Sequence, residues 1–280
     1  MVQGGARHAA GHGPALTPRT AAEVSRRPRG SGGPPINDKI YIHEFITITR
    51  HNRARYMQHM TANFSPIAQE ERHQLCYGVW GIVGSTAWWP GVVNLWEEDG
   101  FAGLASSFRH ELSHPALQDP KLESWWAAAA DMRSGGVDRL LLPAPWTRTI
   151  EQLCADGVRG EVYAHEQITV PPGQAADFLE RVREEAVPYY GRFGWVLAGA
   201  WRTALGDDSE CFLLWAVPDL ERWAEFEAAY DADRATGGWK ARLRASARSF
   251  QRILLADAPL SPMRIGRQPG RADRAGDWAE

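Results

Sequence analysis

The sequence predicts an α+β protein in which one strand–helix–strand–strand–helix–strand unit occurs twice. Two observations favour this interpretation. The segments Gly78–Phe108 and Gly199–Trp223 each contain apolar strands joined by a turn and followed by a helical stretch. The same His-Glu pair stands in the opening strand of each half, as His43-Glu44 and His165-Glu166, 122 residues apart. Matching segments at a nearly constant spacing are typical of a duplicated domain.

The first unit opens with Lys39–Ile48, in which two kinds of residue alternate with period two. Isoleucines occupy one face, whereas Tyr41, His43 and Phe45 share the other, and this alternation predicts a strand. The elements expected next are a helix over Asn52–Leu75 with a break near Ser65-Pro66, strands Cys76–Val83 and Val92–Trp96, helices Gly100–Leu112 and Pro120–Arg133, and a strand Val137–Leu142.

The second unit repeats this order. Its expected elements are strand Glu161–Val170, helix Gln174–Tyr190, strands Trp195–Thr203 and Cys211–Val217, helices Asp219–Asp231 and Trp239–Ala247, and strand Phe250–Leu255. When the last strands of the two units are aligned as Val137–Leu142 and Phe250–Leu255, Arg139 corresponds to Arg252 at an offset of 113 residues.

Each unit therefore follows the ferredoxin-like βαββαβ plan. Antiparallel strands covered by helices on one face leave the other face bare. Two bare faces from one chain can close on each other, so we expect two fused ferredoxin-like domains that form a dimeric α/β barrel within one polypeptide.

The expected divisions of the chain follow from composition. Both ends contain too few large apolar residues to offset the entropy of ordering. We expect a disordered tail over 1–37, a first domain over 38–145, a linker over 146–157, a second domain over 158–259 and a disordered tail over 260–280.

Charge and cysteine content narrow the class of protein. The net charge of −3 gives no broad basic field, so nucleic acid is not an expected partner. No run of about 18 apolar residues occurs, so we expect no membrane span. The three cysteines are odd in number and far apart, which favours reduced thiols in the cytoplasm over a disulfide framework.

The second unit resembles the NIPSNAP family of the dimeric α/β-barrel superfamily. The matching stretches are Val170-Pro-Pro-Gly173, Gly199-Ala-Trp-Arg-Thr-Ala-Leu-Gly206, Leu214-Trp215, Trp239-Lys240 and Arg252-Ile-Leu-Leu255. The first unit is a more divergent copy. The resemblance implies a barrel that binds a small molecule or is associated with haem. The sequence departs from the family at Ala164-His165-Glu166, where Glu-Leu-Arg is usual, and at Leu213 and Asn94, where a His is often seen.

The two repeated histidines are the first candidates for chemistry. His43 and His165 share a strand face with Tyr41 and Tyr163, and such a mixed polar and aromatic face suits a barrel interior. Since histidine titrates near neutral pH, the pair could transfer protons or act as ligands. The alternative is that both are hydrogen-bonded packing residues retained by duplication.

A second motif, His110-Glu111-Leu112-Ser113-His114, matches H-E-x-x-H, which in zinc proteases places two ligands one helical turn apart. On a helical wheel Phe101, Leu104, Phe108 and Leu112 form the apolar stripe, and both histidines fall on the opposite side. Because that side should face solvent and no third ligand is evident, the sequence predicts no metal site.

Further candidates surround the hairpins. The four hairpin tryptophans either line an apolar ligand cavity or simply form core; they are Trp80, Trp96, Trp201 and Trp215. Asn94-Leu95-Trp96 resembles the Asn and Trp of cofactor-free monooxygenases in the same superfamily, which implies that Asn94 binds a substrate oxygen. Arg202 could pair with a substrate carboxylate, or with a surface acid.

We therefore expect a barrel that binds a small apolar or aromatic metabolite, with acid–base or cofactor-free oxidative chemistry carried by His43, His165 and Asn94. An enzyme of this kind would be a cofactor-independent monooxygenase or an isomerase. The alternative is a non-catalytic binding or scaffold protein, for which haem is a candidate ligand; the first expectation is that no cofactor is required. The sequence leaves open whether the chain is a monomer with an internal pseudo-dimer or a homodimer.

Overall fold

The computed structural model describes residues 36–232 and 238–274, which belong to one structural unit, Pro35–Glu280. Residues 1–35 of the expected N-terminal tail and residues 275–280 of the expected C-terminal tail lie outside this description. Asn37, assigned to the first tail, is instead buried and donates hydrogen bonds to Tyr41 Oη and the Thr147 carbonyl oxygen.

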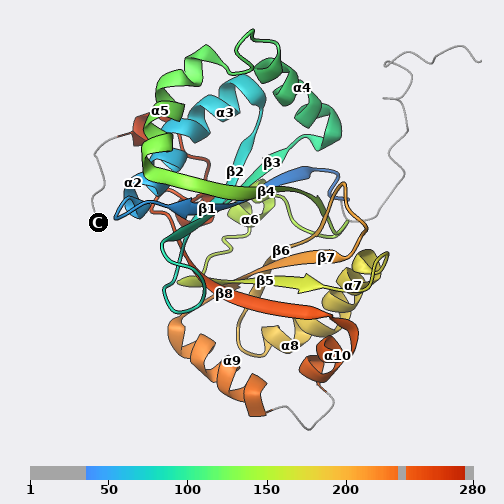
Figure 1. The fold of residues 1–280 in the computed structure, drawn as a ribbon. Coiled ribbons are helices and arrows are strands. Elements are labelled where there is room, and N and C mark those ends of the chain that lie inside the picture. Colours follow the sequence, from blue (N-terminus) through green and yellow to red (C-terminus); the bar gives the residue numbers. More distant parts are fainter. Residues whose placement is uncertain (1–35, 233–237, 275–280) are drawn as a thin grey trace, which may run out of the picture. The chain divides into compact units, whose positions relative to one another are not determined.

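The order of the elements confirms the duplicated plan (Figure 1). The first half contains β1 (Ile40–Ile48), α2 (Arg53–Gln58), η1 (His59–Phe64), α3 (Ser65–Arg72), β2 (Leu75–Ile82), β3 (Gly91–Glu98), α4 (Gly100–Leu112), η2 (Pro120–Leu122), α5 (Glu123–Met132) and β4 (Arg133–Pro143). The second half contains α6 (Ile150–Ala155), β5 (Val162–Thr169), α7 (Ala175–Arg181), η3 (Val182–Ala186), α8 (Val187–Gly191), β6 (Val196–Thr203), β7 (Glu210–Val217), α9 (Leu220–Ala232), α10 (Trp239–Ser246), β8 (Ser249–Asp257), α11 (Pro262–Ile265) and η5 (Arg271–Asp273).

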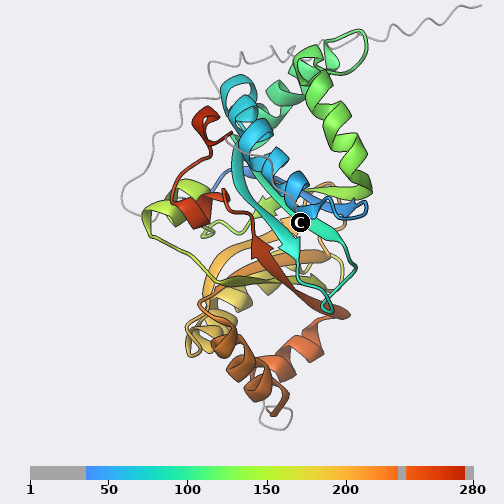
Figure 2. The ribbon, with the colours of Figure 1, turned by 90° about the vertical axis from the view of Figure 1, so that its left-hand side faces the viewer.

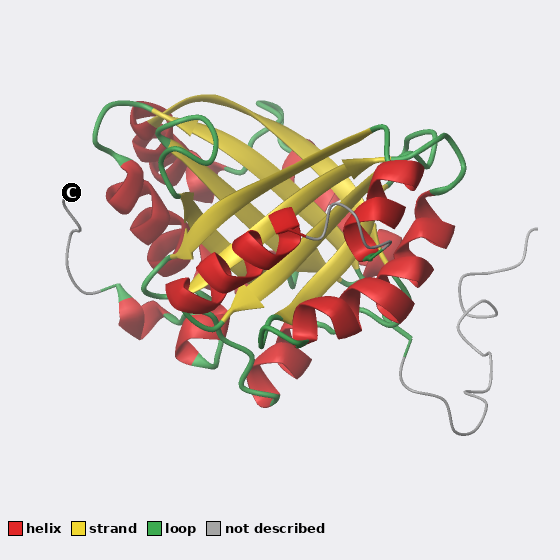
Figure 3. Cartoon of the chain, turned by 90° about the horizontal axis from the view of Figure 1, so that it is seen from below, coloured by secondary structure: helices red, strands yellow, loops and turns green. Residues whose placement is uncertain are grey.

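The eight strands of the described residues form one closed barrel, which Figure 3 shows in yellow. Their order around the barrel is β1-β3-β2-β8-β5-β7-β6-β4. Every neighbouring pair is antiparallel, and the halves meet at two seams, β2 with β8 and β4 with β6. Because direction alternates around the ring, β1 and β5 run the same way. The pseudo-two-fold axis that relates the halves therefore runs along the barrel.

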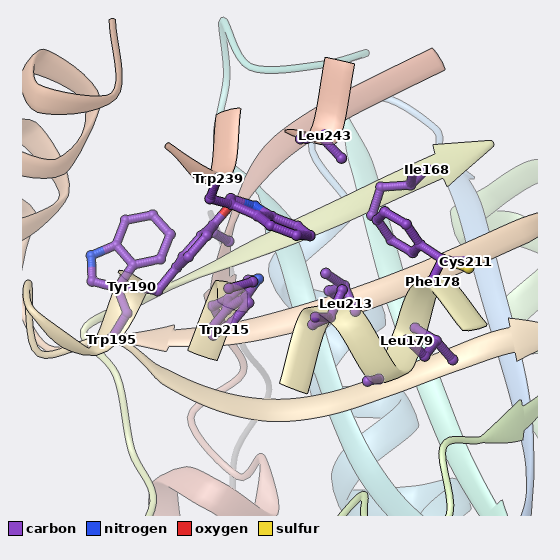
Figure 4. Packing of buried hydrophobic residues seen from close by; sticks show 14 of the residues in the cluster. Ile168, Phe178, Leu179, Tyr190, Trp195, Cys211, Leu213, Trp215, Trp239 and Leu243 are labelled. Carbon is purple, nitrogen blue, oxygen red and sulfur yellow. The ribbon is translucent and has the colours of Figure 1, made fainter. Parts of the chain in front are cut away.

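Most of the helices lie on the outer surface of the barrel. Figure 1 shows α2 to α5 over the first half and α7 to α10 over the second. Each layer buries its own apolar cluster against the strands, and Figure 4 shows Tyr190, Trp195, Trp215 and Trp239 packed in the second of these layers. None of the helices in the described residues combines the length and apolar character of a membrane span.

A third cluster fills the interior of the barrel and contains residues from all eight strands. Trp80 and Trp201 lie within it, and each indole lies over the glycine two residues before it. A Cβ at Gly78 would stand 2.1 Å from the Trp80 ring, and one at Gly199 would stand 1.9 Å from the Trp201 ring. The repeated Gly-x-Trp sequence therefore exists because the ring occupies the space of a Cβ.

The first helix of each half is continuous through a π-helical segment, so the break expected near Ser65-Pro66 does not occur. The π segments η1 and η3 end just before Pro66 and Pro188, which lie 122 residues apart. Since proline lacks an N–H and its ring crowds the preceding turn, a widened turn accommodates it without ending the helix.

Two segments expected to be irregular are structured. Within the expected linker, α6 begins with a capping box between Thr149 and Gln152. Residues 260–274, expected to be part of a disordered tail, include α11 and η5, and Met263 is buried. Gln268 donates to the Cys76 carbonyl and accepts from the Cys76 N–H, so polar backbone pairing, which composition does not reveal, orders this segment.

The register of the last strands corrects the sequence alignment. Arg139 pairs with His43, whereas the residue that pairs with His165 is Ile253. The structural offset is thus 114 residues and not 113. Because one residue of slip reverses the face of a strand, Arg139 points into the barrel, while Arg252 points outward.

Candidate functional site

The two repeated histidines meet at the centre of the barrel. The Nε2 atoms of His43 and His165 lie 3.0 Å apart, and the rings are stacked at an interplanar angle of 17°. The two positions are related by the pseudo-two-fold axis, so the pair lies on that axis. Their placement on the inner face agrees with the period-two pattern of β1 and β5.

Both rings are neutral near pH 7. Burial lowers the pKa of His165 to about 3, and burial, the neighbouring ring and the Arg139 guanidinium lower the pKa of His43 well below its ordinary value. In a hydrogen bond between two neutral imidazoles, one Nε2 donates and the other accepts. One ring therefore has a basic Nδ1 and the other has an Nδ1–H. Among the described residues, neither Nδ1 has a hydrogen-bond partner.

A cavity of about 390 Å³ opens at the end of the barrel above this pair. Its lining combines aromatic, amide and hydroxyl groups with one cation: Phe45, Thr47, Trp88, Ser134, Gly135, Gly136, Val137, Arg139, Gln167 and Gln251. The Phe45 ring also contacts both histidines, at centroid distances of 4.6 Å to His43 and 5.5 Å to His165. Phe45 thus separates the cavity from the histidine pair.

Arg139 provides the positive charge of the cavity. Its guanidinium lies over Phe45 and Phe212 at 5.9 and 5.6 Å, and its Nε lies 3.6 Å from Glu210 Oε2. Within the described part of the chain, the buried Nη1 atom has no hydrogen-bond partner. A buried N–H that lacks an acceptor is costly, so the site is suited to a ligand oxygen.

The opposite end of the barrel is closed. Figure 2 shows the yellow-green α6 beside the red α11, and both elements contact β2. Beneath them Glu97 Oε2 accepts hydrogen bonds from Tyr41 Oη and the Ile150 N–H, each at 3.0 Å, and burial raises the pKa of this carboxyl. Tyr41 and Tyr163 are fully buried at this end, so they lie away from the cavity.

Two candidates predicted from the hairpin of the first half do not face the cavity. Asn94 and Trp96 project to the outer surface of the sheet, where both donate to Glu44 Oε2, at 2.9 and 2.8 Å. The structure therefore places them with a buried carboxylate and not with the histidines. Burial raises the pKa of Glu44.

The second half has a matching arrangement. Trp215 projects outward and donates to Glu166 at 3.1 Å, and Tyr190 donates to the same carboxylate at 2.7 Å. Arg252 completes the group with a 2.7 Å contact to Glu166. Of the four tryptophans expected around a ligand, only Trp80 and Trp201 face inward, where they pack as core. Arg202 forms a 2.8 Å ion pair with Asp208 in its own hairpin.

The H-E-x-x-H segment is oriented differently from the wheel prediction. Phe101, Phe108 and Leu112 are exposed, whereas Leu104 and Ser107 are buried. The buried face of α4 is therefore about 100° around the helix axis from the centre of its apolar stripe. Polar contacts explain this rotation, since Glu111 binds Arg72 at 3.0 Å and His110 binds Asp119 at 2.9 Å. His114 follows the end of the helix, and the two histidines do not form a helical pair.

Sequence reasoning missed Arg139, Gln167 and Gln251. Strand alternation could have identified Gln167, because it lies two residues after His165 and therefore on the same face of the strand. Arg139 was missed because the sequence alignment paired it with Arg252, which lies on the outward face of its strand.

Comparison with protein families gives one match, in the second half of the chain. Residues 167–262 match the family described as NIPSNAP. The second half is therefore similar to the NIPSNAP family over these residues. The match extends from within β5 to the start of α11, and it confirms the resemblance found in the sequence. Comparison with curated proteins gives no match.

Solved structures similar to this chain include a protein from Lactobacillus acidophilus provisionally described as a monooxygenase, with 10% identity, a TM-score of 0.49, and coverage of 84% of this chain and 97% of the other. A chlorite dismutase from Candidatus Nitrospira defluvii has 9% identity, a TM-score of 0.41 and coverage of 84% and 95%. A haem-binding protein from Thermus thermophilus has 14% identity, a TM-score of 0.40 and coverage of 79% and 91%. At these scores the similarity supports no statement about ligand or chemistry.

Proposed function

We propose that this protein binds a small aromatic metabolite bearing a carboxylate or enolate oxygen in the cavity above the histidine pair, and exchanges a proton with it. The proposal depends on Arg139, which lines a cavity of about 390 Å³ and whose buried Nη1 atom has no acceptor among the described residues. Cavities of this size accommodate small ligands.

The surrounding groups define the expected ligand. Arg139 would hold the anionic oxygen, since charge-assisted hydrogen bonds from a guanidinium favour carboxylates. Phe45 and Trp88, which contact each other edge to face at 5.2 Å, offer apolar surface to a ring. The amides of Gln167 and Gln251 provide further donors and acceptors.

The histidine pair supplies acid–base chemistry without charging in the resting state. One ring has a basic Nδ1 that can take a proton from a carbon beside a carbonyl group, and the other has an Nδ1–H that can return one. Their depressed pKa values keep both rings neutral. Because Phe45 separates the cavity from the pair, its ring must move for the reacting atom to reach a nitrogen. Proton abstraction followed by return is an isomerase-type reaction; capture of the carbanion by oxygen would be the oxidative alternative.

Binding is tested by titrating the protein with benzoate in a calorimeter. We expect Arg139→Gln to weaken binding by about 10- to 100-fold, the effect of losing a hydrogen bond to a charged group. The control is Arg202→Gln, which removes an arginine of similar exposure that pairs with Asp208 and should leave binding unchanged. Equal affinity in the wild type and Arg139→Gln would contradict the proposed anion site.

Proton exchange is tested with phenylpyruvate in D₂O, with loss of the methylene proton signals followed by NMR. We expect the protein to accelerate exchange and His43→Gln or His165→Gln to abolish the acceleration, with benzoate affinity retained. If exchange is unaffected by both substitutions, the pair has only a packing role. Oxygen uptake in the same assay would indicate the oxidative alternative.

Haem does not fit the described arrangement of the histidines. Both rings are buried, and their Nε2 atoms are hydrogen-bonded to each other. Phe45 and Phe212 lie against the rings. An axial ligand requires an accessible nitrogen facing a cavity. A visible absorption band in the purified protein would overturn this conclusion.

A further inference from the structure

We propose that Glu71, His110 and Asp119 form a binding site for a divalent transition-metal ion, on the outer layer of the first half and separate from the histidine pair. The three residues come from α3, from α4 and from the segment that precedes η2. One oxygen or nitrogen atom from each lies within 4.8 Å of the other two.

The separations match those of metal ligands. His110 Nε2 lies 2.9 Å from Asp119 Oδ2 and 3.7 Å from Glu71 Oε2. Atoms bound to one ion at about 2.0–2.2 Å are roughly 3–3.5 Å apart. The two distances from His110 are therefore close to those of metal ligands, and the separation of Glu71 from Asp119, which is within 4.8 Å, would need to shorten by at most about 1–2 Å. One imidazole and two carboxylates form a ligand set that suits zinc, manganese and iron.

The orientation of α4 supplies an independent reason. The helix leaves Phe101, Phe108 and Leu112 at the surface and turns His110 toward the two carboxylates. Exposure of three large apolar side chains is unfavourable, so the polar side of the helix must gain more from facing inward. The contacts of Arg72 with Glu111 and of His110 with Asp119 supply part of that gain, and an ion shared by Glu71, His110 and Asp119 would add to it.

This site differs from a zinc-protease site. His114 comes after the end of α4 and is not one of the three grouped residues. The ion would link α3, α4 and the segment before α5, which is a structural role, and the ligand carboxylates come from outside the H-E-x-x-H motif.

The test uses the full-length protein after treatment with EDTA, titrated with Zn²⁺ and with Mn²⁺ in separate experiments, with Mg²⁺ as a comparison. We expect one equivalent of Zn²⁺ or Mn²⁺ per chain and, at 100-fold excess over Kd, a rise in Tm of about 5–11 °C. His110→Ala and Glu71→Gln should each lose this binding, whereas His114→Ala should retain it.

Folding of each variant is verified by far-UV circular dichroism, and Glu71→Gln is the mildest change because it preserves size. Absence of stoichiometric binding by the wild type would overturn the proposal. So would binding that persists in both His110→Ala and Glu71→Gln. Loss of binding in His114→Ala alone would assign the ion to the H-E-x-x-H motif and also overturn it.

Discussion

Replacing Gly199 by alanine tests how tightly the barrel interior is packed. The new Cβ would stand 1.9, 2.2 and 2.7 Å from three atoms of the Trp201 ring, so the ring must move. It has little room, because Trp201 is 1% exposed and contacts Tyr41 and Tyr77 at centroid distances of 5.5 and 5.4 Å. Overpacking of a rigid core costs about 1–3 kcal/mol, and we expect the upper end of this range.

For a chain of this size that cost lowers Tm by about 6–12 °C, which differential scanning calorimetry measures directly. The matched control is Gly206→Ala, because a Cβ at Gly206 has Thr203 Cγ2 as its nearest neighbour at 3.8 Å, an ordinary contact. Its effect should stay within about 0.5 kcal/mol. In a Trp201→Leu background, Gly199→Ala should lose most of its cost. A Tm for Gly199→Ala equal to that of the control would refute the reasoning.

Two further predictions concern buried charge. Arg252→Met should destabilise the protein by about 3–5 kcal/mol in urea unfolding, because it leaves Glu166 buried without its cation. Adding Glu166→Gln to the same chain should recover much of this loss of stability. An unchanged urea midpoint in Arg252→Met would contradict the role of the pair. The histidine pair predicts acid sensitivity: burial lowers the pKa of His165 to about 3 and that of His43 below its ordinary value, so the unfolded chain binds more protons below about pH 6.5. Stability should therefore fall as pH drops through this window by up to about 1.4 kcal/mol per pH unit for each histidine, and His43→Leu with His165→Leu should flatten this slope when Tm is measured from pH 7 to 4.

The fold was predictable because its signals are local and occur twice. Period-two alternation in Lys39–Ile48 and the repeated hairpins fix the strands, and duplication indicates that two bare sheet faces come from one chain. The orientation of α4 was not predictable in this way. A helical wheel assumes that the apolar stripe faces inward, whereas contacts such as Arg72 with Glu111 join residues 39 positions apart and override it.

The candidate site was predicted in part. Parity along β1 and β5 correctly placed His43 and His165 on the inner face of the barrel. Asn94 points to the opposite face of the sheet from His43, because it pairs with Glu44 on the neighbouring strand. This orientation could be predicted only from the strand register, which the sequence does not provide. Arg139 was missed for the same reason, since a difference of one residue in the alignment decides whether it faces the cavity.

The fusion of both halves into one polypeptide has a consequence for how this barrel can change. In a symmetric homodimer, any substitution would appear on both sides of the two-fold axis at once. Here Arg139 lies across the axis from Ile253, and Phe45 from Gln167. A substitution in one half therefore changes one wall of the cavity and leaves the other wall unchanged.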